Sequence, residues 1–175
     1  EGTDPTIHAI NHRRSNLNIK KVVNGENANP NDEFEFTITV TQKDEDGKEI
    51  ADNTSTTDDD LWFSVYNNGY VDLGNRLVSS EWQKSVNEKG EIYYHAPNKT
   101  QLIVKLKNNE NLRFVNVVSN TDFTVVEGNT ANYELESITA SGFSSAEGGK
   151  DGYLSTGNTI TGNIDVLIVE PKYVR

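Results

Sequence analysis

The chain of 175 residues contains no cysteine and no methionine. Without cysteine, neither a disulfide nor a thiolate metal site can form, so the usual covalent staple of extracellular domains is excluded. Acidic residues outnumber basic ones and give a formal net charge of −11. This charge opposes nucleic acid and anionic lipid as partners. An exported protein of this composition would need another way to resist force and proteases.

Long apolar runs are also missing. No run approaches the roughly 20 residues that span a bilayer, and no segment has the pattern of a signal peptide. We therefore expect no membrane contact from this segment, and any targeting parts to have been removed or to lie outside it. Helix signals are nearly absent too, because no stretch shows sustained 3.6-residue periodicity with caps.

Catalytic and metal-binding motifs of the common kinds are lacking, so we expect a non-enzymatic domain without cofactor or metal. No glycine-rich phosphate loop follows an apolar strand. The run Asp58-Asp59-Asp60 lacks the spaced ligands and closing glutamate of a calcium loop, which favours a solvated charge run. The three histidines, His8, His12 and His95, are expected to be exposed.

The residues that are present predict an all-β domain. The clearest strand runs from Phe34 to Thr41, where apolar and polar residues alternate after an Asn/Pro/Asp turn cluster. Many short strands with frequent turns indicate a sandwich. The other predicted strands are Leu61 to Tyr66, Glu91 to His95, Gln101 to Leu106, Asn111 to Val118, Asp122 to Val126, Tyr133 to Ala140 and Ile164 to Val169.

One core is expected for a chain of this length. Residues 1–16 are interpreted as a linker or the end of a preceding repeat, and residues 171–175 as a second linker. The sandwich would comprise residues 17–170, with a middle insertion over residues 53–100. The insertion has too few apolar residues for a core of its own, so it should pack on the sandwich.

Two charged residues occupy positions that the strand period reserves for core side chains. Lys21 shares the phase of Leu17 and Ile19, and Glu127 shares that of Phe123 and Val125. A buried ammonium and a buried carboxylate are costly unless they meet, form hydrogen bonds or react. We therefore predict that both side chains lie inside the sandwich and within reach of one another or of a shared group on the last strand.

Four motifs follow one another along the chain. They are Leu17-x-Ile19-x-Lys21-x-Val23-x-Gly25, Asp32-x-Phe34-x-Phe36-x-Ile38-x-Val40, Leu106 to Phe114, and Thr121-x-Phe123-x-Val125-x-Glu127. Their order resembles that in the B-type (CnaB-type) repeat domains of Gram-positive collagen adhesins and related pilin domains. The resemblance implies an immunoglobulin-like β-sandwich, here with an enlarged middle insertion, in an extracellular stalk or shaft on the cell wall. Its partners would be neighbouring repeat domains or pilin subunits.

In that family a first-strand lysine condenses with a last-strand asparagine or aspartate, assisted by a buried glutamate. Burial lowers the pKa of a lysine so that a neutral amine can attack, and raises that of a carboxyl so that it can polarise the acceptor. By position, the resemblance makes Lys21 the nucleophile and Glu127 the assisting carboxyl of an intramolecular isopeptide bond.

The acceptor departs from the family pattern, because Glu170 occupies the asparagine position. Asp165 and Asn163 are the alternatives, although Asp165 has the opposite phase and Asn163 precedes the predicted strand. If no bond forms, Lys21 between Glu127 and Glu170 would make a buried ion cluster.

The resemblance also points to one asparagine near the start of the chain and one lysine near its end. Asn11 could belong to an upstream repeat, although a linker residue is the preferred interpretation. Lys172, after Pro171, weakly resembles the lysine through which pilin sortases join subunits, but the aromatic residues of that motif are missing.

Aromatic residues between positions 61 and 95 raise a second hypothesis. Trp62 alternates out of phase with Phe63 and Val65, so a large ring faces outward, as in glycan-binding platforms. The alternative function is therefore a carbohydrate- or host-ligand-binding module, with Trp62 and Trp82 as the candidate contacts.

Overall fold

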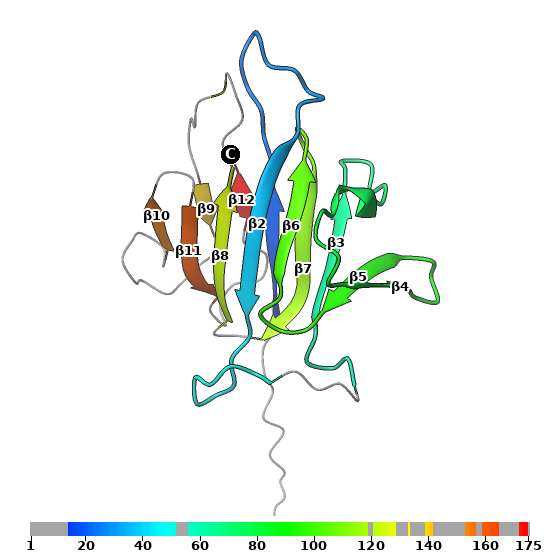
Figure 1. Ribbon diagram of the computed structural model, residues 1–175, viewed down its shortest axis with the longest axis vertical. Helices are drawn as coiled ribbons and strands as arrows, with labels where there is room; N and C mark the ends of the chain where they lie inside the picture. Colours follow the sequence, from blue (N-terminus) through cyan, green and yellow to red (C-terminus); the bar gives the residue numbers. More distant parts are fainter. Residues whose placement is uncertain are drawn as a thin grey trace, which may run out of the picture.

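The computed structural model describes residues 14–51, 56–118, 121–128, 133, 139–141, 153–156, 159–164 and 172–174. In these ranges the chain forms two layers of β-strands (Figure 1) and one turn of 3₁₀ helix, η1 (Gly74–Arg76). The strands are β1 (Arg14–Lys20), β2 (Phe34–Thr41), β3 (Leu61–Tyr66), β4 (Gln83–Val86), β5 (Ile92–Ala96), β6 (Gln101–Leu106), β7 (Asn111–Val118), β8 (Thr121–Glu127), β9 (Thr139–Ser141), β10 (Tyr153–Thr156), β11 (Thr159–Ile164) and β12 (Lys172–Val174).

One sheet has seven strands in the order β4-β5-β3-β7-β1-β12-β9, and the other has five in the order β10-β11-β8-β2-β6. The pair β1 and β12 is parallel, whereas the other strand pairs among the described residues are antiparallel. The fold is thus the immunoglobulin-like β-sandwich that the strand pattern and the resemblance predicted.

Strand alternation builds the core between the sheets. In β2 every second residue is buried, and the facing strands β3 and β7 contribute their own inward residues. Because this phase is fixed, the charged residues that follow it are carried into the same interior. The largest fully buried side chains include Phe36, Ile38, Phe63, Leu112 and Phe114.

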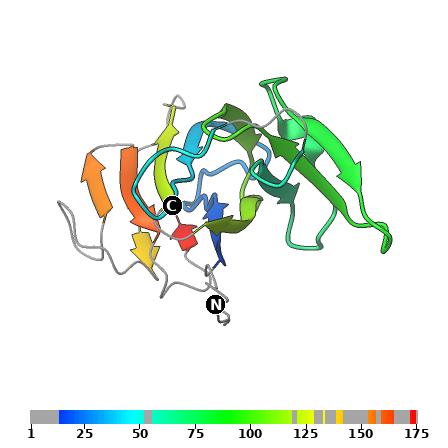
Figure 2. The same cartoon turned by 90° about the horizontal axis from the view of Figure 1, so that it is seen from below.

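The middle insertion extends the seven-stranded sheet. Its strand β3 pairs with β7, β5 pairs with β3, and β4 forms the edge. Figure 2 shows β4 and β5 reaching outward on the side opposite β10 and β11. Leu61, Phe63 and Tyr94 nevertheless lie in the common core. The insertion therefore shares the core of the sandwich and widens one sheet.

The structure differs from the sequence predictions at several strands. Residues 172–174 form β12 instead of a linker, and β1 begins at Arg14 rather than after residue 16. A three-residue strand with lysine and a preceding proline carries little periodic signal, and its pairing with β1 and β9 defines it.

The strands β4, β10 and β11 were likewise not predicted. Of the predicted strand Tyr133 to Ala140, the described residues place only Thr139 and Ala140 in a strand, β9. Of the predicted strand Ile164 to Val169, only Ile164 is described, at the end of β11.

Candidate functional site

Lys21 directly follows β1 and keeps the extended direction of that strand. Its backbone N–H donates to the carbonyl of Glu110 at 3.1 Å, and its own carbonyl accepts from the N–H of Asn109 at 2.7 Å. Ile19, two residues earlier, is buried, and the side chain of Lys21 shares its inward phase. Lys21 is consequently only 6% exposed.

Glu127 is the last residue of β8 and lies opposite Phe36 of β2. It continues the inward phase of Phe123 and Val125 and is 5% exposed. Its Oε2 lies 2.8 Å from Nζ of Lys21. The two residues come from different sheets, so their ion pair crosses the interior of the sandwich. The predicted burial and proximity of Lys21 and Glu127 are therefore observed.

An aromatic ring also lies beside the lysine. Nζ of Lys21 lies 3.9 Å from the ring centroid of Phe34, which is itself buried. The Phe34 ring meets Tyr133 edge-on at 5.0 Å. The negative face of an aromatic ring attracts an ammonium, and low polarity strengthens the attraction to a carboxylate. This arrangement can hold an ion pair or pass a proton between Lys21 and Glu127.

The candidate acceptors differ in what can be said of them. Asn163 lies in β11, and its backbone pairs with Asp122. Asp122 is five strand positions from Glu127, a separation of about 16 Å at the usual rise. This register argues against Asn163 as a partner of Lys21. Asp165 and Glu170 lie outside the described residues.

Strand β12 is the immediate neighbour of β1 in the seven-stranded sheet. Lys172 pairs with Asn18 on one side and with Ser141 on the other, and Val174 pairs with Lys20. Lys172 belongs to the sheet and not to a linker, while Asn11 lies outside the described residues.

The two tryptophans have different surroundings. Phe63 is fully buried, and Trp62 is on the opposite face of β3, as its phase predicts. Trp82 instead packs against the core, with its ring edge-on to Tyr94 at 5.1 Å. Trp62 lines a surface hollow that Trp82 does not line. The structure thus separates the two candidate ligand contacts.

The expectation of an exposed His95 is wrong. His95 is 8% exposed, and its Nδ1 lies 2.8 Å from Oδ2 of Asp60. Its ring stacks on Trp62 with centroids 4.4 Å apart. Asp60 is therefore engaged with a histidine and is not simply a member of a solvated run. His8 and His12 lie outside the described residues.

Sequence reasoning also missed an internal ion pair between distant segments. Arg76 of η1 donates to both carboxylate oxygens of Glu110, each at 3.0 Å. Neither residue continues an apolar strand, so no periodicity marks them. Among the described residues no group of three or more histidines, cysteines or carboxylates is placed to hold a metal ion. The described part likewise holds no helix long and apolar enough to cross a membrane.

Comparison with known proteins agrees with this geometry. A family described as a domain of unknown function, DUF7601, matches residues 15–166. A search of curated proteins finds no match. The fold is similar to solved major pilins of Streptococcus pyogenes, and the chain spans less than half the length of each.

The first of these, a major pilin, gives a TM-score of 0.57 at 14% identity, covering 93% of this chain and 47% of the pilin. The T3.2 major pilin gives a TM-score of 0.54 at 18% identity, covering 93% of this chain and 44% of the pilin. The T-13 major pilin gives a TM-score of 0.52 at 12% identity, covering 93% of this chain and 43% of the pilin. The chain therefore has a pilin-like fold.

Proposed function

Because the chain belongs to the family described as a domain of unknown function, DUF7601, and has a pilin-like fold, we propose that it is a non-enzymatic shaft or stalk unit of a pilus or adhesin. The buried Lys21–Glu127 pair carries this proposal. The domain would be located on the Gram-positive cell wall and joined to neighbouring domains or pilin subunits.

The strand order suits a unit that bears tension. Since β1 and β12 are parallel neighbours, the beginning of β1 and the end of β12 lie toward opposite ends of the sheet. Tension applied at Arg14 and Val174 would load the hydrogen bonds of β1 along the strand axis. Bonds loaded in this way must break together, and β1 is also bonded to β7 over most of its length. This geometry supports the proposed force-resisting function.

The Lys21 site would strengthen that arrangement in one of two chemical forms. In the first, the neutral amine attacks a carbonyl near the last strand, a C–N bond forms, and ammonia leaves an amide acceptor or water leaves a carboxyl acceptor. Glu127 would donate a proton to the acceptor oxygen and return the excess proton to the leaving group. In the second form, Lys21 and Glu127 remain a buried ion pair between the sheets.

Accurate intact mass of the protein distinguishes the two forms. Bond formation removes one water with Asp165 or Glu170 as acceptor, or one ammonia with an amide acceptor. Lys21→Ala and Glu127→Ala should restore the full mass, and Lys20→Ala is the matched control that should leave the mass unchanged. The bond would restrict the unfolded chain like a long-loop disulfide, an effect of about 4 to 5 kcal/mol. A full mass in the unmodified protein would leave the ion pair as the functional form.

Force spectroscopy tests the stalk function itself. A tandem array pulled through its termini should resist unfolding far better than an array carrying Lys21→Ala, if either form of the site strengthens the β1 region. The same two arrays should be digested with a broad-specificity protease. Unfolding of the unmodified array at the force of the variant array, together with equal digestion rates, would contradict the proposal.

A further inference from the structure

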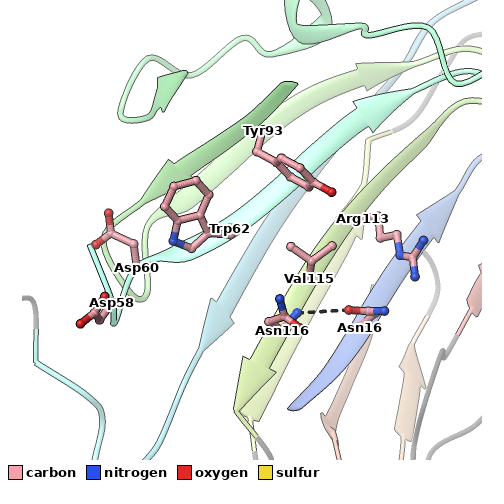
Figure 3. Close-up of a pocket in the computed structure, with 8 residues that line it drawn as sticks. All are labelled: Asn16, Asp58, Asp60, Trp62, Tyr93, Arg113, Val115 and Asn116. Carbon is pink, nitrogen blue, oxygen red and sulfur yellow. Dashed lines mark hydrogen bonds between the residues drawn. The ribbon is translucent and has the colours of Figure 1, made fainter. Parts of the chain in front are cut away.

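The outer face of the seven-stranded sheet carries two adjoining hollows in the described residues. Their volumes are 590 Å³ and 510 Å³, and both are lined by Tyr93, Arg113 and Val115. Figure 3 shows the side chains that line the first hollow. Most project from neighbouring strands on one side of the sheet, and Asp58 and Asp60 come from the turn before β3. Together the hollows form one groove across β5, β3 and β7. Volumes of this size are typical of small-ligand sites.

The aromatic part of the groove is held in place before any ligand arrives. Trp62 stacks on His95, and its Nε1 donates to the carbonyl of Thr57 at 3.2 Å. Oδ2 of Asp60 lies 2.8 Å from Nδ1 of His95 and holds the histidine ring in place. An aromatic platform fixed on two sides loses little conformational freedom on binding, which favours affinity.

A second aromatic pair lies at the other end of the groove. Tyr66 and Tyr70 stack with centroids 5.5 Å apart, and Tyr70 is 82% exposed. Tyr70 and Asn116, which line different hollows, have φ values of 58° and 54°. Positive φ is unfavourable for residues other than glycine and is concentrated at functional sites. The backbone N–H of Tyr70 donates to the carbonyl of Asn67 at 3.0 Å, so its positive φ belongs to this turn, and the turn presents the exposed ring to the groove.

The charged groups of the groove indicate the kind of ligand. Four carboxylates, those of Asp58, Asp60, Asp72 and Glu91, line it together with two cations, Lys89 and Arg113. This excess of negative charge, on a chain of net charge −11, opposes sulfated, sialylated or phosphorylated ligands.

Most of these carboxylates already accept hydrogen bonds within the protein. Asp72 accepts from the Tyr94 hydroxyl at 2.9 Å, and Glu91 accepts from the side-chain amide of Asn87 at 2.7 Å. A carboxylate has about four lone-pair positions, so each retains acceptor capacity for neutral hydroxyl donors. Hydroxyl groups beside an apolar ring face are the two features that a pyranose presents.

We propose that this groove binds a neutral oligosaccharide, with Trp62 and Tyr93 as stacking platforms and Asp58 and Asp72 as hydroxyl acceptors. This binding function goes beyond the stalk function and does not depend on the state of Lys21, which lies on the opposite, inward side of the sheet.

The test begins with a printed array of neutral oligosaccharides and their sulfated and sialylated counterparts. Hits are then titrated against Trp82→Phe, in which Trp62 is the sole tryptophan, so that a ligand on the platform changes the fluorescence emission. We expect binding to neutral glycans and an emission change. Trp62→Ala should weaken binding by about tenfold or more, and Trp62→Phe should recover part of it.

Three outcomes would overturn the proposal. These are no binding to any arrayed glycan, binding confined to sulfated or sialylated glycans, and equal affinity of Trp62→Ala and the unmodified protein. Thermal melting of each variant separates lost binding from lost folding. If Trp62→Ala fails to fold, Tyr93→Ala serves as the second variant with the same expected loss. The Tyr93 ring is only partly buried, so its removal should leave the core intact.

Discussion

Arg76 and Glu110 form a two-pronged ion pair that fastens the middle insertion to the β6–β7 turn, with both N···O distances at 3.0 Å. Hydrogen bonding to Glu110 raises the pKa of Arg76. The carboxylate of Glu110 also accepts a hydrogen bond from the backbone N–H of Lys107 at 2.8 Å. The backbone carbonyl of Glu110 accepts a hydrogen bond from the N–H of Lys21. The insertion is thus connected, through one glutamate, to the backbone beside the Lys21 site.

Glu110→Ala should destabilise the protein by about 2 to 3 kcal/mol, because the largely buried Arg76 would lose both short hydrogen bonds and keep only the more distant Glu33 carboxylate, 3.8 Å from its Nη1. For a chain of this size that corresponds to a melting temperature lower by very roughly 4 to 12 °C. The matched control is Glu49→Ala, whose partner Lys99 is 59% exposed, and it should change stability by less than about 0.5 kcal/mol. Equal melting temperatures for the two variants would contradict the prediction.

Gly74→Ala should be strongly destabilising even though the position is on a surface turn. An added Cβ would lie 1.7 Å from the hydroxyl oxygen of Tyr94 and 2.4 Å from its Cζ. Tyr94 is buried and bound to Asp72, so the ring cannot move aside and η1 must shift. We expect a loss of about 1 to 3 kcal/mol in chemical denaturation.

Gly69→Ala is the control for this substitution. Its Cβ would meet only the side-chain oxygen of Asn67, at 3.4 Å. This variant should melt close to the unmodified protein. If Gly74→Ala had the same melting temperature as Gly69→Ala, η1 would accommodate the added methyl group freely, which would contradict the prediction.

Tyr94 should make stability fall at alkaline pH. Burial, followed by the hydrogen bond to Asp72, raises the pKa of Tyr94 to about 12, against an ordinary value of 10.0. A raised folded pKa means that the contribution is complete below pH 10 and is lost as pH rises from 10 toward 12. The stability advantage of the unmodified protein over Tyr94→Phe should therefore shrink across that window. If the urea midpoints of the unmodified protein and Tyr94→Phe differed by the same amount at every pH from 9 to 11.5, the prediction would be wrong.

Strand periodicity predicted much of the fold because burial in a sandwich follows a period of two. The limits of β2, β3, β6 and β7 agree with the sequence prediction. The first three alternate over their full length, and β7 alternates from Leu112 to Val115. The same rule placed Lys21 and Glu127 inside and Trp62 outside. These positions need only the phase of their own strand.

Features that depend on the meeting of distant segments were not predicted. His95 follows Tyr93 in outward phase, but it is covered by Trp62 and bound by Asp60, which lies 35 residues away. Arg76 and Glu110 meet across 34 residues. The register of β12 against β1 was also missed. No local pattern encodes such contacts, because tertiary packing alone brings the groups together.

A double-mutant cycle on Lys21 and Glu127 should show strong coupling if the mass measurement finds no covalent bond. Lys21→Met or Glu127→Gln alone disrupts the pair and leaves the other group inside the sandwich without its partner at 2.8 Å. Removing one member of a buried pair costs about 3 to 5 kcal/mol, whereas replacing both by groups of similar shape is often neutral. We expect Lys21→Met with Glu127→Gln to be more stable than Lys21→Met alone, because no unpartnered charge remains. Additive losses in urea unfolding would show that the two charges do not interact across the core.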